Sequence, residues 1–210
     1  MDRAAVFVDA GYLFAQGSEL IAGKKLQRSE TSLDQDRLIQ LLTDLSARLT
    51  KLPLLRIYWY DGTDRGPTAV HQSLAMKPNV KIRLGLVNSF GEQKGVDSLI
   101  VSDLINLSRN GAMTDVVLLT GDEDIRVGVQ QAQEVGVRVH LVGIDGSRNN
   151  QSILLKQEAD TLSMLSKQEV SDFLSIVTPV IATPPAAQAS APTILTAASV
   201  DTQNRPMMDT

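Results

Sequence analysis

The sequence predicts an α/β fold of three layers, in which a central parallel sheet of about five strands is covered by helices on both faces. Short β-branched runs alternate with helical patterns through residues 1–177, and the strand candidates are apolar along most of their length. Such alternation is typical of parallel sheets, whose strands are buried on both faces. With 210 residues, 43% of them hydrophobic, the chain can form one domain with a sizeable core.

Five short apolar segments are the strand candidates. They are residues 4–8, 55–60, 80–86, 116–119 and 137–142. The commonest order for five strands of this kind is 3-2-1-4-5, which places the first and fourth strands side by side with the topological switch between them. In the second candidate, the alternation of side chains sends Trp59 to one face of the sheet and Tyr58 and Tyr60 to the other. We expect all three rings in the core.

Helical spacing of apolar residues predicts the covering layers. Between the first two strands the leucines recur as on one face of a helix, at positions 38, 41, 42, 45 and 49, and Ser32 with Gln35 resembles a capping box at its start. A second helix is predicted over residues 96–109, with Leu99, Ile100, Leu104 and Leu107 facing inward. A third covers residues 123–135 and is stopped by Gly136. Residues 152–159 and 167–176 also read as helical, with a short edge strand near 162–165.

Composition changes at the C-terminus and restricts the class of protein. Residues 178–210 are rich in Pro, Ala and Thr and carry few charges, which predicts a disordered tail after a domain of residues 1–177. The apolar segment at residues 4–8 is too short for a secretion signal or a membrane span, so we expect a cytoplasmic protein.

The net charge of the chain is -4, which argues against a protein that coats DNA. An acidic site that recruits a cation still permits a nuclease.

Any metal must be held by oxygen. The chain has no cysteine, and its two histidines, His71 and His140, are too few for a histidine-rich site and have no partner spacing that suggests catalysis. Hard divalent cations such as Mg²⁺ and Mn²⁺ favour carboxylate and water oxygens.

Four aspartates fall at one predicted edge of the sheet. Asp9 directly follows the first strand and Asp122 the fourth, so they face each other across the crevice in which such sheets bind ligands. Asp97 opens the helix after the third strand, behind Lys94, and Asp124 lies just inside the helix that Asp122 begins. We therefore expect Asp9, Asp97, Asp122 and Asp124 to bind a divalent metal.

Each of these acids also has a simpler interpretation. Asp122 is suited to cap the helix that follows it, and Asp97 to complement the dipole of its helix from the first turn. Asp9 is followed by Ala10 and Gly11, where we predict no helix that needs an acid as a cap. The occurrence of all four acids on one edge favours the metal site.

Four motifs carry a resemblance to a known family. They are FVDAGYLF from Phe7, YWYDG from Tyr58, QKGVD from Gln93 and LLTGDEDI from Leu118. In this order and spacing, over residues 4–165, the chain resembles the NYN domains of the PIN-like nuclease superfamily, in their bacterial LabA-like branch. The resemblance implies a PIN-like fold and the cleavage of RNA with Mg²⁺ or Mn²⁺ as cofactor. We expect the RNA to be single-stranded. The resemblance also implies catalytic and metal-binding roles for Asp9, Asp97, Asp122 and Asp124.

Further residues are candidates for contact with RNA. Many NYN domains have Asn three residues after the first acid, where this chain has Tyr12, which we expect to contact substrate. Lys94 is suited to clamp a phosphate, and residues 62–78 to set substrate choice. Four basic residues are candidates for following the RNA backbone, although scattered surface charge is the simpler interpretation: Arg65, Lys77, Lys81 and Arg83.

Two other function classes fit part of the pattern. Haloacid-dehalogenase-type phosphatases also place an aspartate after the first strand, but they need a second acid two residues later, where this chain has Gly11. A module without catalytic activity, which binds RNA or a protein in the same crevice, is the main alternative, with Tyr12 as the mark of lost activity. Whether two copies of the chain form a homodimer stays open.

Overall fold

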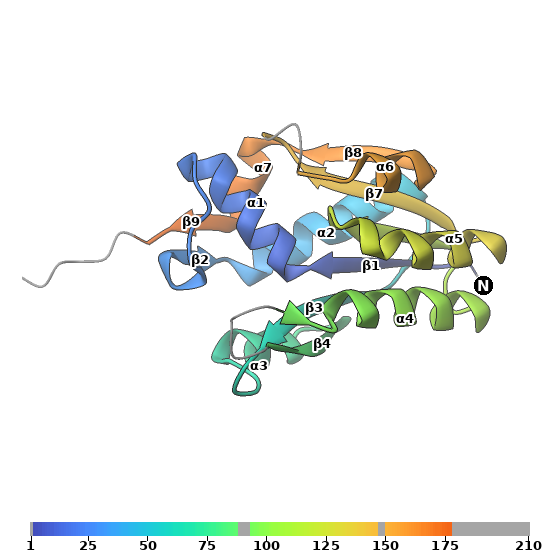
Figure 1. The fold of residues 1–210 in the computed structure, drawn as a ribbon, viewed down its shortest axis with the longest axis horizontal. Coiled ribbons are helices and arrows are strands. Elements are labelled where there is room, and N and C mark those ends of the chain that lie inside the picture. Colours follow the sequence, from blue (N-terminus) through green and yellow to red (C-terminus); the bar gives the residue numbers. More distant parts are fainter. Residues whose placement is uncertain (1, 88–92, 147–149, 178–210) are drawn as a thin grey trace, which may run out of the picture. The chain divides into compact units, whose positions relative to one another are not determined.

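A seven-stranded sheet forms the centre of the molecule, in the order β5-β4-β3-β1-β6-β7-β8 (Figure 1). The computed structural model describes residues 2–87, 93–146 and 150–177, so the predicted tail at 178–210 lies outside the described residues. The strands are β1 (Ala4–Asp9), β3 (Leu54–Thr63), β4 (Val80–Val87), β5 (Gln93–Lys94), β6 (Asp115–Leu119), β7 (Arg138–Ile144) and β8 (Thr161–Leu165).

The predicted fold class and strand order are confirmed. The five expected strands correspond to β1, β3, β4, β6 and β7, and they lie in the expected order 3-2-1-4-5, all parallel. The sheet is larger than predicted, because β8 adds a sixth parallel strand beside β7 and β5 pairs antiparallel with β4. As an edge strand, β8 leaves Leu162 and Met164 exposed, so its sequence gives only a weak strand pattern.

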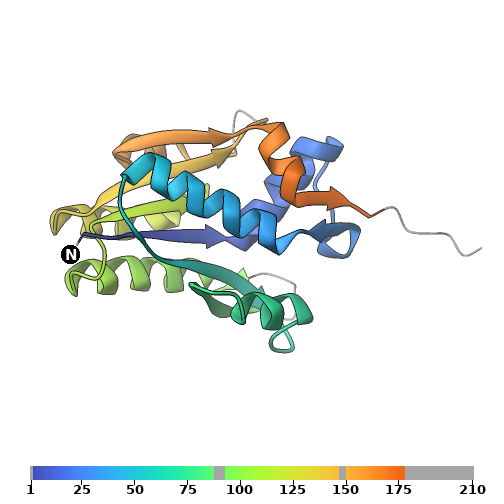
Figure 2. The same ribbon diagram turned by 180° about the vertical axis from the view of Figure 1, so that it is seen from behind.

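Helices cover both faces of this sheet. On one face pack α1 (Ala10–Ala22), α2 (Gln35–Thr50), α3 (Ala69–Ala75) and α7 (Lys167–Phe173). On the other face pack α4 (Val96–Arg109), α5 (Arg126–Glu134) and α6 (Ile153–Glu158). Helices α4 and α5 lie in front of the sheet in Figure 1, and α2 lies in front of it in Figure 2. Trp59 belongs to the first of these cores, and Tyr58 and Tyr60 to the second, as the alternation predicts.

The predicted helices are largely right, but two of their ends differ. Helix α4 has the predicted bounds, whereas α2 is capped by Asp34, which accepts a hydrogen bond from the Arg37 N–H. The predicted capping box was wrong because Ser32 belongs to β2 (Thr31–Leu33). The helix expected to reach residue 176 ends at Phe173, since β9 (Leu174–Ile176) pairs with β2 in a second, antiparallel sheet.

Helix α1 was not predicted at all, and its discovery corrects one expectation about the site. Asp9 is the N-cap of α1 and accepts a hydrogen bond from the Tyr12 N–H, so it does have a capping role. Small residues obscure the helical pattern: Gly17 packs so closely on β9 and α7 that an added Cβ would lie 2.7 Å from Leu174 Cδ2 and 3.4 Å from Val170 Cγ1. Among the described helices, none is both long enough and apolar enough to cross a membrane.

Candidate functional site

Asp9 is the most buried of the four predicted acids. It ends β1, is 8% exposed, and uses both carboxylate oxygens within the protein. Oδ1 accepts from the Tyr12 N–H at 3.1 Å, and Oδ2 accepts from the Thr120 hydroxyl at 3.0 Å. Burial, together with the negative charges of Asp97 and Asp122, raises the pKa of Asp9 to about 6 despite these hydrogen bonds. The carboxyl is therefore held in one orientation at a cost that an approaching cation would reduce.

Asp122 and Asp124 lie in the turn after β6, the strand next to β1. Asp122 caps the short 3₁₀ helix η2 (Glu123–Ile125) by accepting from the Asp124 N–H at 2.9 Å. Its own N–H lies 3.4 Å from the Thr120 hydroxyl oxygen. Both aspartates are exposed, so the capping role leaves carboxylate oxygens free to face solvent or a ligand.

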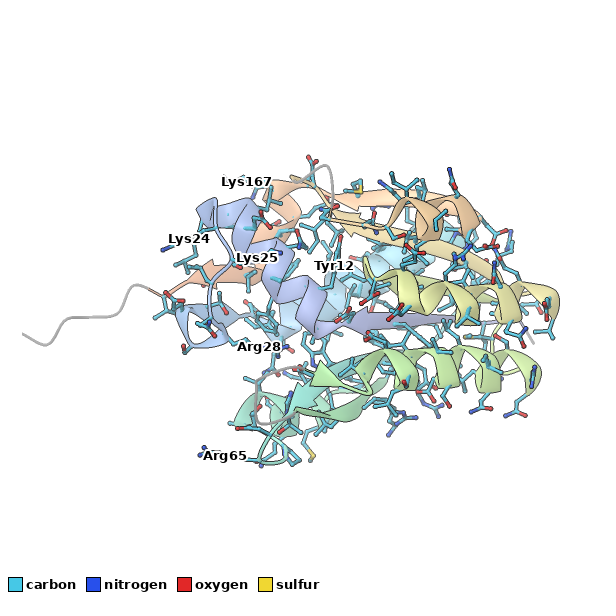
Figure 3. All side chains as sticks on the ribbon, viewed as in Figure 1. Tyr12, Lys24, Lys25, Arg28, Arg65 and Lys167 are labelled. Carbon is cyan, nitrogen blue, oxygen red and sulfur yellow. The ribbon has the colours of Figure 1, made fainter. Side chains whose placement is uncertain are left out.

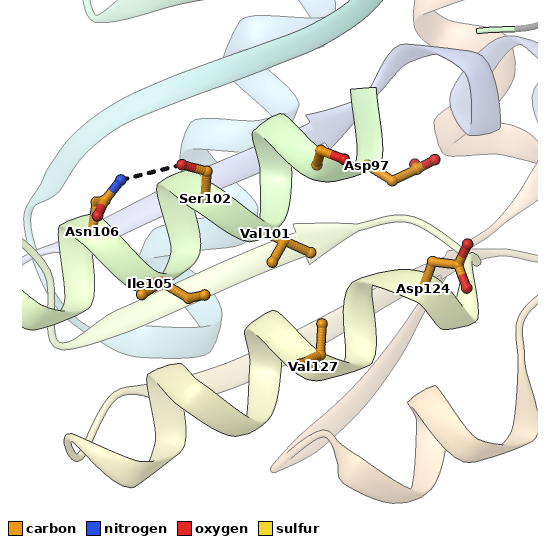
Figure 4. Close-up of a pocket in the computed structure, with 8 residues that line it drawn as sticks. Asp97, Val101, Ser102, Ile105, Asn106, Asp124 and Val127 are labelled. Atoms are coloured by element: carbon orange, nitrogen blue, oxygen red, sulfur yellow. Dashed lines mark hydrogen bonds between the residues drawn. The ribbon is translucent and has the colours of Figure 1, made fainter. Parts of the chain in front are cut away.

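Asp97 reaches the same edge from the first turn of α4. Burial, followed by the charges of Asp122 and Asp124, raises the pKa of Asp97. Asp97 and Asp124 line one end of a groove of about 560 Å³ between α4 and α5 (Figure 4). The groove continues along α4 past Ser102 and Asn106, which hydrogen-bond to each other. It offers a path across the molecular surface that begins at the acids.

The four acids therefore gather at the carboxyl edge, but less tightly than the sequence suggested. Within the described residues, no three His, Asp or Glu side chains lie close enough together to ligate one ion directly. The donors are nevertheless of the type that Mg²⁺ prefers, because this ion commonly uses one or two carboxylates and completes its shell with water and phosphate oxygens. Burial is the main cause of the raised pKa values of Asp9 and Asp97, and the negative charges of neighbouring acids add to it. The residues thus fit a water-bridged divalent cation.

Tyr12 and Lys94 are the predicted substrate contacts, and the structure describes the side chain of Tyr12 only. The Tyr12 hydroxyl accepts a hydrogen bond from the Ile144 N–H at 3.2 Å, and burial raises the pKa of Tyr12 to about 12. The Tyr12 hydroxyl thereby connects α1 to the end of β7, which is a structural role. The backbone of Lys94 belongs to β5, but its side chain lies outside the described part of the chain, and its contact with substrate stays a prediction.

The turn after β6 requires a glycine at position 121, because there is no room for a side chain. A Cβ at this position would lie 2.2 Å from the carbonyl oxygen of Asn150 and 2.6 Å from Cε2 of Tyr12. Backbone and ring therefore close over the turn, and this holds Asp122 beside Asp9. The geometry depends on a residue without a side chain.

Two residues of the site were missed from the sequence. Thr120 connects the acids, because its hydroxyl donates to Asp9 and its oxygen faces the Asp122 N–H. Gln151 supports this strand end by donating to the carbonyl oxygens of Thr120, at 2.8 Å, and Val142, at 3.2 Å. The position of Thr120 at a strand end beside Gly-Asp was a usable signal. Gln151 gave none, since its role depends on the packing of a distant loop.

The basic residues proposed to follow the RNA backbone are only partly available. Lys77 pairs with Asp36 at 2.6 Å and Arg83 with Asp103 at 2.9 Å. Arg65, also one of the four, lies 3.4 Å from Asp64, and it shares the side of the molecule where β1 ends with Lys24, Lys25, Arg28 and Lys167 (Figure 3). Lys24, Lys25 and Lys167 therefore add positive charge on the side of the molecule where β1 ends.

Comparisons with known proteins agree with this fold. The model of the family described as NYN domain matches residues 3–166. A curated relative, the uncharacterized protein y4oD of Sinorhizobium fredii, is 56% identical over 109 residues, which are 52% of this chain and 51% of that protein. The match thus spans about half the length of that relative.

Among solved structures, the chain is similar to a protein of unknown function, VPA0982 of Vibrio parahaemolyticus. The TM-score is 0.56 at 18% identity, and the match covers 83% of this chain and 96% of that one. At this identity the likeness concerns the fold alone.

Proposed function

Since the chain belongs to the NYN domain family, within the PIN-like nuclease superfamily, we propose that it is a metal-dependent nuclease that hydrolyses single-stranded RNA. The observation that carries this proposal is the set of acids at the carboxyl edge. Asp9, Asp97 and Asp122 come from three separate connections, and the pKa of Asp9 is raised by burial and, to a smaller extent, by the charges of the other two. The four motifs further favour the LabA-like branch of the family.

The cofactor that we propose is Mg²⁺ or Mn²⁺. Asp9, Asp97 and Asp122 would hold it, partly through water, with Asp124 as a fourth ligand or as support from the groove. A bound divalent cation would supply a more acidic water molecule and positive charge opposite the phosphate. The acids provide what such an ion needs, namely hard oxygen donors whose mutual repulsion it relieves.

The chain's own residues prepare the site for this reaction. Thr120 and the Tyr12 N–H fix the two oxygens of Asp9, so this ligand does not need to be ordered when substrate arrives. The groove between α4 and α5 gives the strand a path past Asp97 and Asp124. Lysines and arginines at the same edge attract the phosphates, and Lys94 is proposed to contact one near Asp97 (Figure 3).

A cleavage assay tests the proposal. Wild-type protein, Asp122→Asn and the control Asp44→Asn are incubated with labelled single-stranded RNA, with Mn²⁺ or Mg²⁺ and with a chelator. Asp122 is exposed, and Asn caps helices as well as Asp does, so the variant should fold. Asp44 lies on the exposed surface of α2. We expect cleavage by wild type and control only with metal, and a loss of about 100-fold or more in Asp122→Asn.

A binding module without catalytic activity is the second candidate. It is favoured by the spacing of the acids, since no three acidic or histidine side chains among the described residues could ligate one ion directly. In the same assay, folded wild-type protein that binds RNA but cleaves none of several sequences with either metal would support this candidate and contradict the nuclease.

A further inference from the structure

A second polar cluster lies at the carboxyl edge, outside the acidic site. Its centre is Asp61, which is 1% exposed and lies near the end of β3. Arg28 donates to both carboxylate oxygens, with Nη2 at 2.6 Å from Oδ1, and His71 Nε2 lies 2.8 Å from Oδ2. The Gly62 N–H adds a fourth hydrogen bond at 2.7 Å. Asp61 is thus fully paired, and Arg28 is fixed in one orientation.

The hydrogen-bond pattern also fixes the form of His71. The Thr68 N–H lies 3.1 Å from His71 Nδ1, and a backbone N–H can only donate, so Nδ1 accepts. The ring hydrogen therefore lies on Nε2 and is donated to Asp61. The cluster combines one positive and one negative group with a neutral ring, so its net charge is zero.

Beside this cluster is a pocket of about 330 Å³, a size within the range of small-ligand sites. Phe14 and Arg28 line it, and the Arg28 guanidinium lies over the Phe14 ring, 4.5 Å from its centre. Val70 contributes an apolar wall, and Ser29 and Thr68 contribute hydroxyl groups. The pocket therefore combines a planar cation stacked on a ring with neutral hydrogen-bonding groups.

The position of this pocket relates it to the acids. Tyr60 is paired with Asp9 across neighbouring strands, and Gly62, which lines the pocket, lies two residues further along β3. With about 4.8 Å between strands and about 3.3 Å per residue, the two sites are on the order of 8 Å apart in the backbone. Ala5 and Phe7 of β1 face the core covered by α4, so the alternation along the strand places Asp9 on that face as well, whereas Phe14 belongs to the core on the other face. An RNA strand that crosses the carboxyl edge of the sheet would therefore contact both the acidic site and this pocket.

We propose that this pocket binds one base of the RNA strand, next to the phosphate that is cleaved. The inference rests on the proposed function for its substrate. The cluster has no net charge, so the pocket is poorly suited to a phosphate, whereas a flat base can stack on the guanidinium of Arg28. Hydroxyls of Ser29 and Thr68 can bond to the edge of the base. Lys24, Lys25 and Arg65 lie on the same side of the molecule as Arg28 and are suited to the phosphates (Figure 3).

The two histidines make a direct binding test available. His71 lines the pocket, whereas His140 is hydrogen-bonded to Asp115, at the start of β6 and the opposite end of the sheet. Because the chain contains no other histidine, the NMR signals of the imidazole rings give one reporter and one internal control. Adenosine 5′-monophosphate is titrated to about 10 mM without metal, beside ribose 5-phosphate, which lacks the base.

A pocket-filling variant provides the matched comparison. Removing Arg28 would leave Asp61 buried without its charged partner and would endanger folding. Val70 is 40% exposed and lines the pocket, so Val70→Trp should fill the space without disturbing the core. Val135→Trp, at a 50% exposed position just after α5, is the control.

The base pocket predicts that the monophosphate shifts the His71 signals but not those of His140, and that ribose 5-phosphate shifts neither. Val70→Trp should weaken this binding about tenfold or more, and Val135→Trp should leave it unchanged. Equal shifts by both compounds, or none by the monophosphate, would overturn the proposal. Because no cleavage is measured, failure here is distinct from failure of the nuclease. An inactive protein whose pocket still binds the monophosphate would refute only the proposed reaction.

Discussion

Replacement of Asp9 by Asn is expected to stabilise the metal-free protein at neutral pH while removing its activity. The Asn side chain has nearly the same shape, can accept from the Tyr12 N–H, and can donate to the Thr120 oxygen. The pKa of Asp9 is raised from 3.8 to about 6, so the folded state binds its proton more tightly than the unfolded state does. The ionised carboxylate therefore opposes folding, and the Asn variant lacks this charge.

The size and pH range of the effect follow from the shift. A change of about two pKa units corresponds to about 3 kcal/mol at pH 8, or about 6–12 °C in melting temperature for a chain of this length. Below about pH 4 the carboxyl is protonated in both states, and the difference should vanish. Between about pH 4 and pH 6 wild type should lose stability as pH rises, relative to the variant.

Urea denaturation in a chelating buffer from pH 4 to pH 8 measures this difference. Asp34→Asn is the matched control, because Asp34 is also a helix N-cap but its side chain is exposed, and its substitution should change stability by less than about 0.5 kcal/mol at every pH. If Asp9→Asn were less stable than wild type at pH 8, or if the difference did not depend on pH, the assignment of a strained, ionised Asp9 would be wrong.

Three other perturbations have defined outcomes. Gly121→Ala places a Cβ 2.2 Å from the Asn150 carbonyl oxygen and should lower the free energy of unfolding by about 1–3 kcal/mol, measured by urea denaturation, together with the cleavage rate. Tyr12→Phe leaves the Ile144 N–H without its acceptor and should destabilise by about 1 kcal/mol but retain cleavage; a loss of cleavage in folded protein would indicate substrate contact instead. Mn²⁺ at about 100 times its dissociation constant should stabilise wild type by about 2.7 kcal/mol in thermal melts, and Asp9→Asn by much less; equal stabilisation of both would place the ion elsewhere.

Much of the sheet and the edge that carries the acids could be predicted from the sequence. Each strand is a short apolar run of its own, and parallel strands joined through helices end on one edge, so the sequence is enough to predict that Asp9 and Asp122 lie near each other. Helix α4 was predicted at both ends because its apolar spacing is regular and Gly95 precedes it. Periodicity and connection rules are local properties, which a single sequence contains.

What only the tertiary structure decided depends on groups that are distant in the chain. The Thr120 hydroxyl that orients Asp9 lies 111 residues away from it, and Arg28 meets Asp61 across 33 residues. Helix α1, with Asp9 as its cap, is hidden in the sequence because its small residues give a weak pattern and are explained only by the close packing of β9 and α7. The sequence by itself determined which elements form and on which edge the acids lie. Folding decided how each carboxyl is oriented and paired, because hydrogen bonds and burial require atoms from several segments at once.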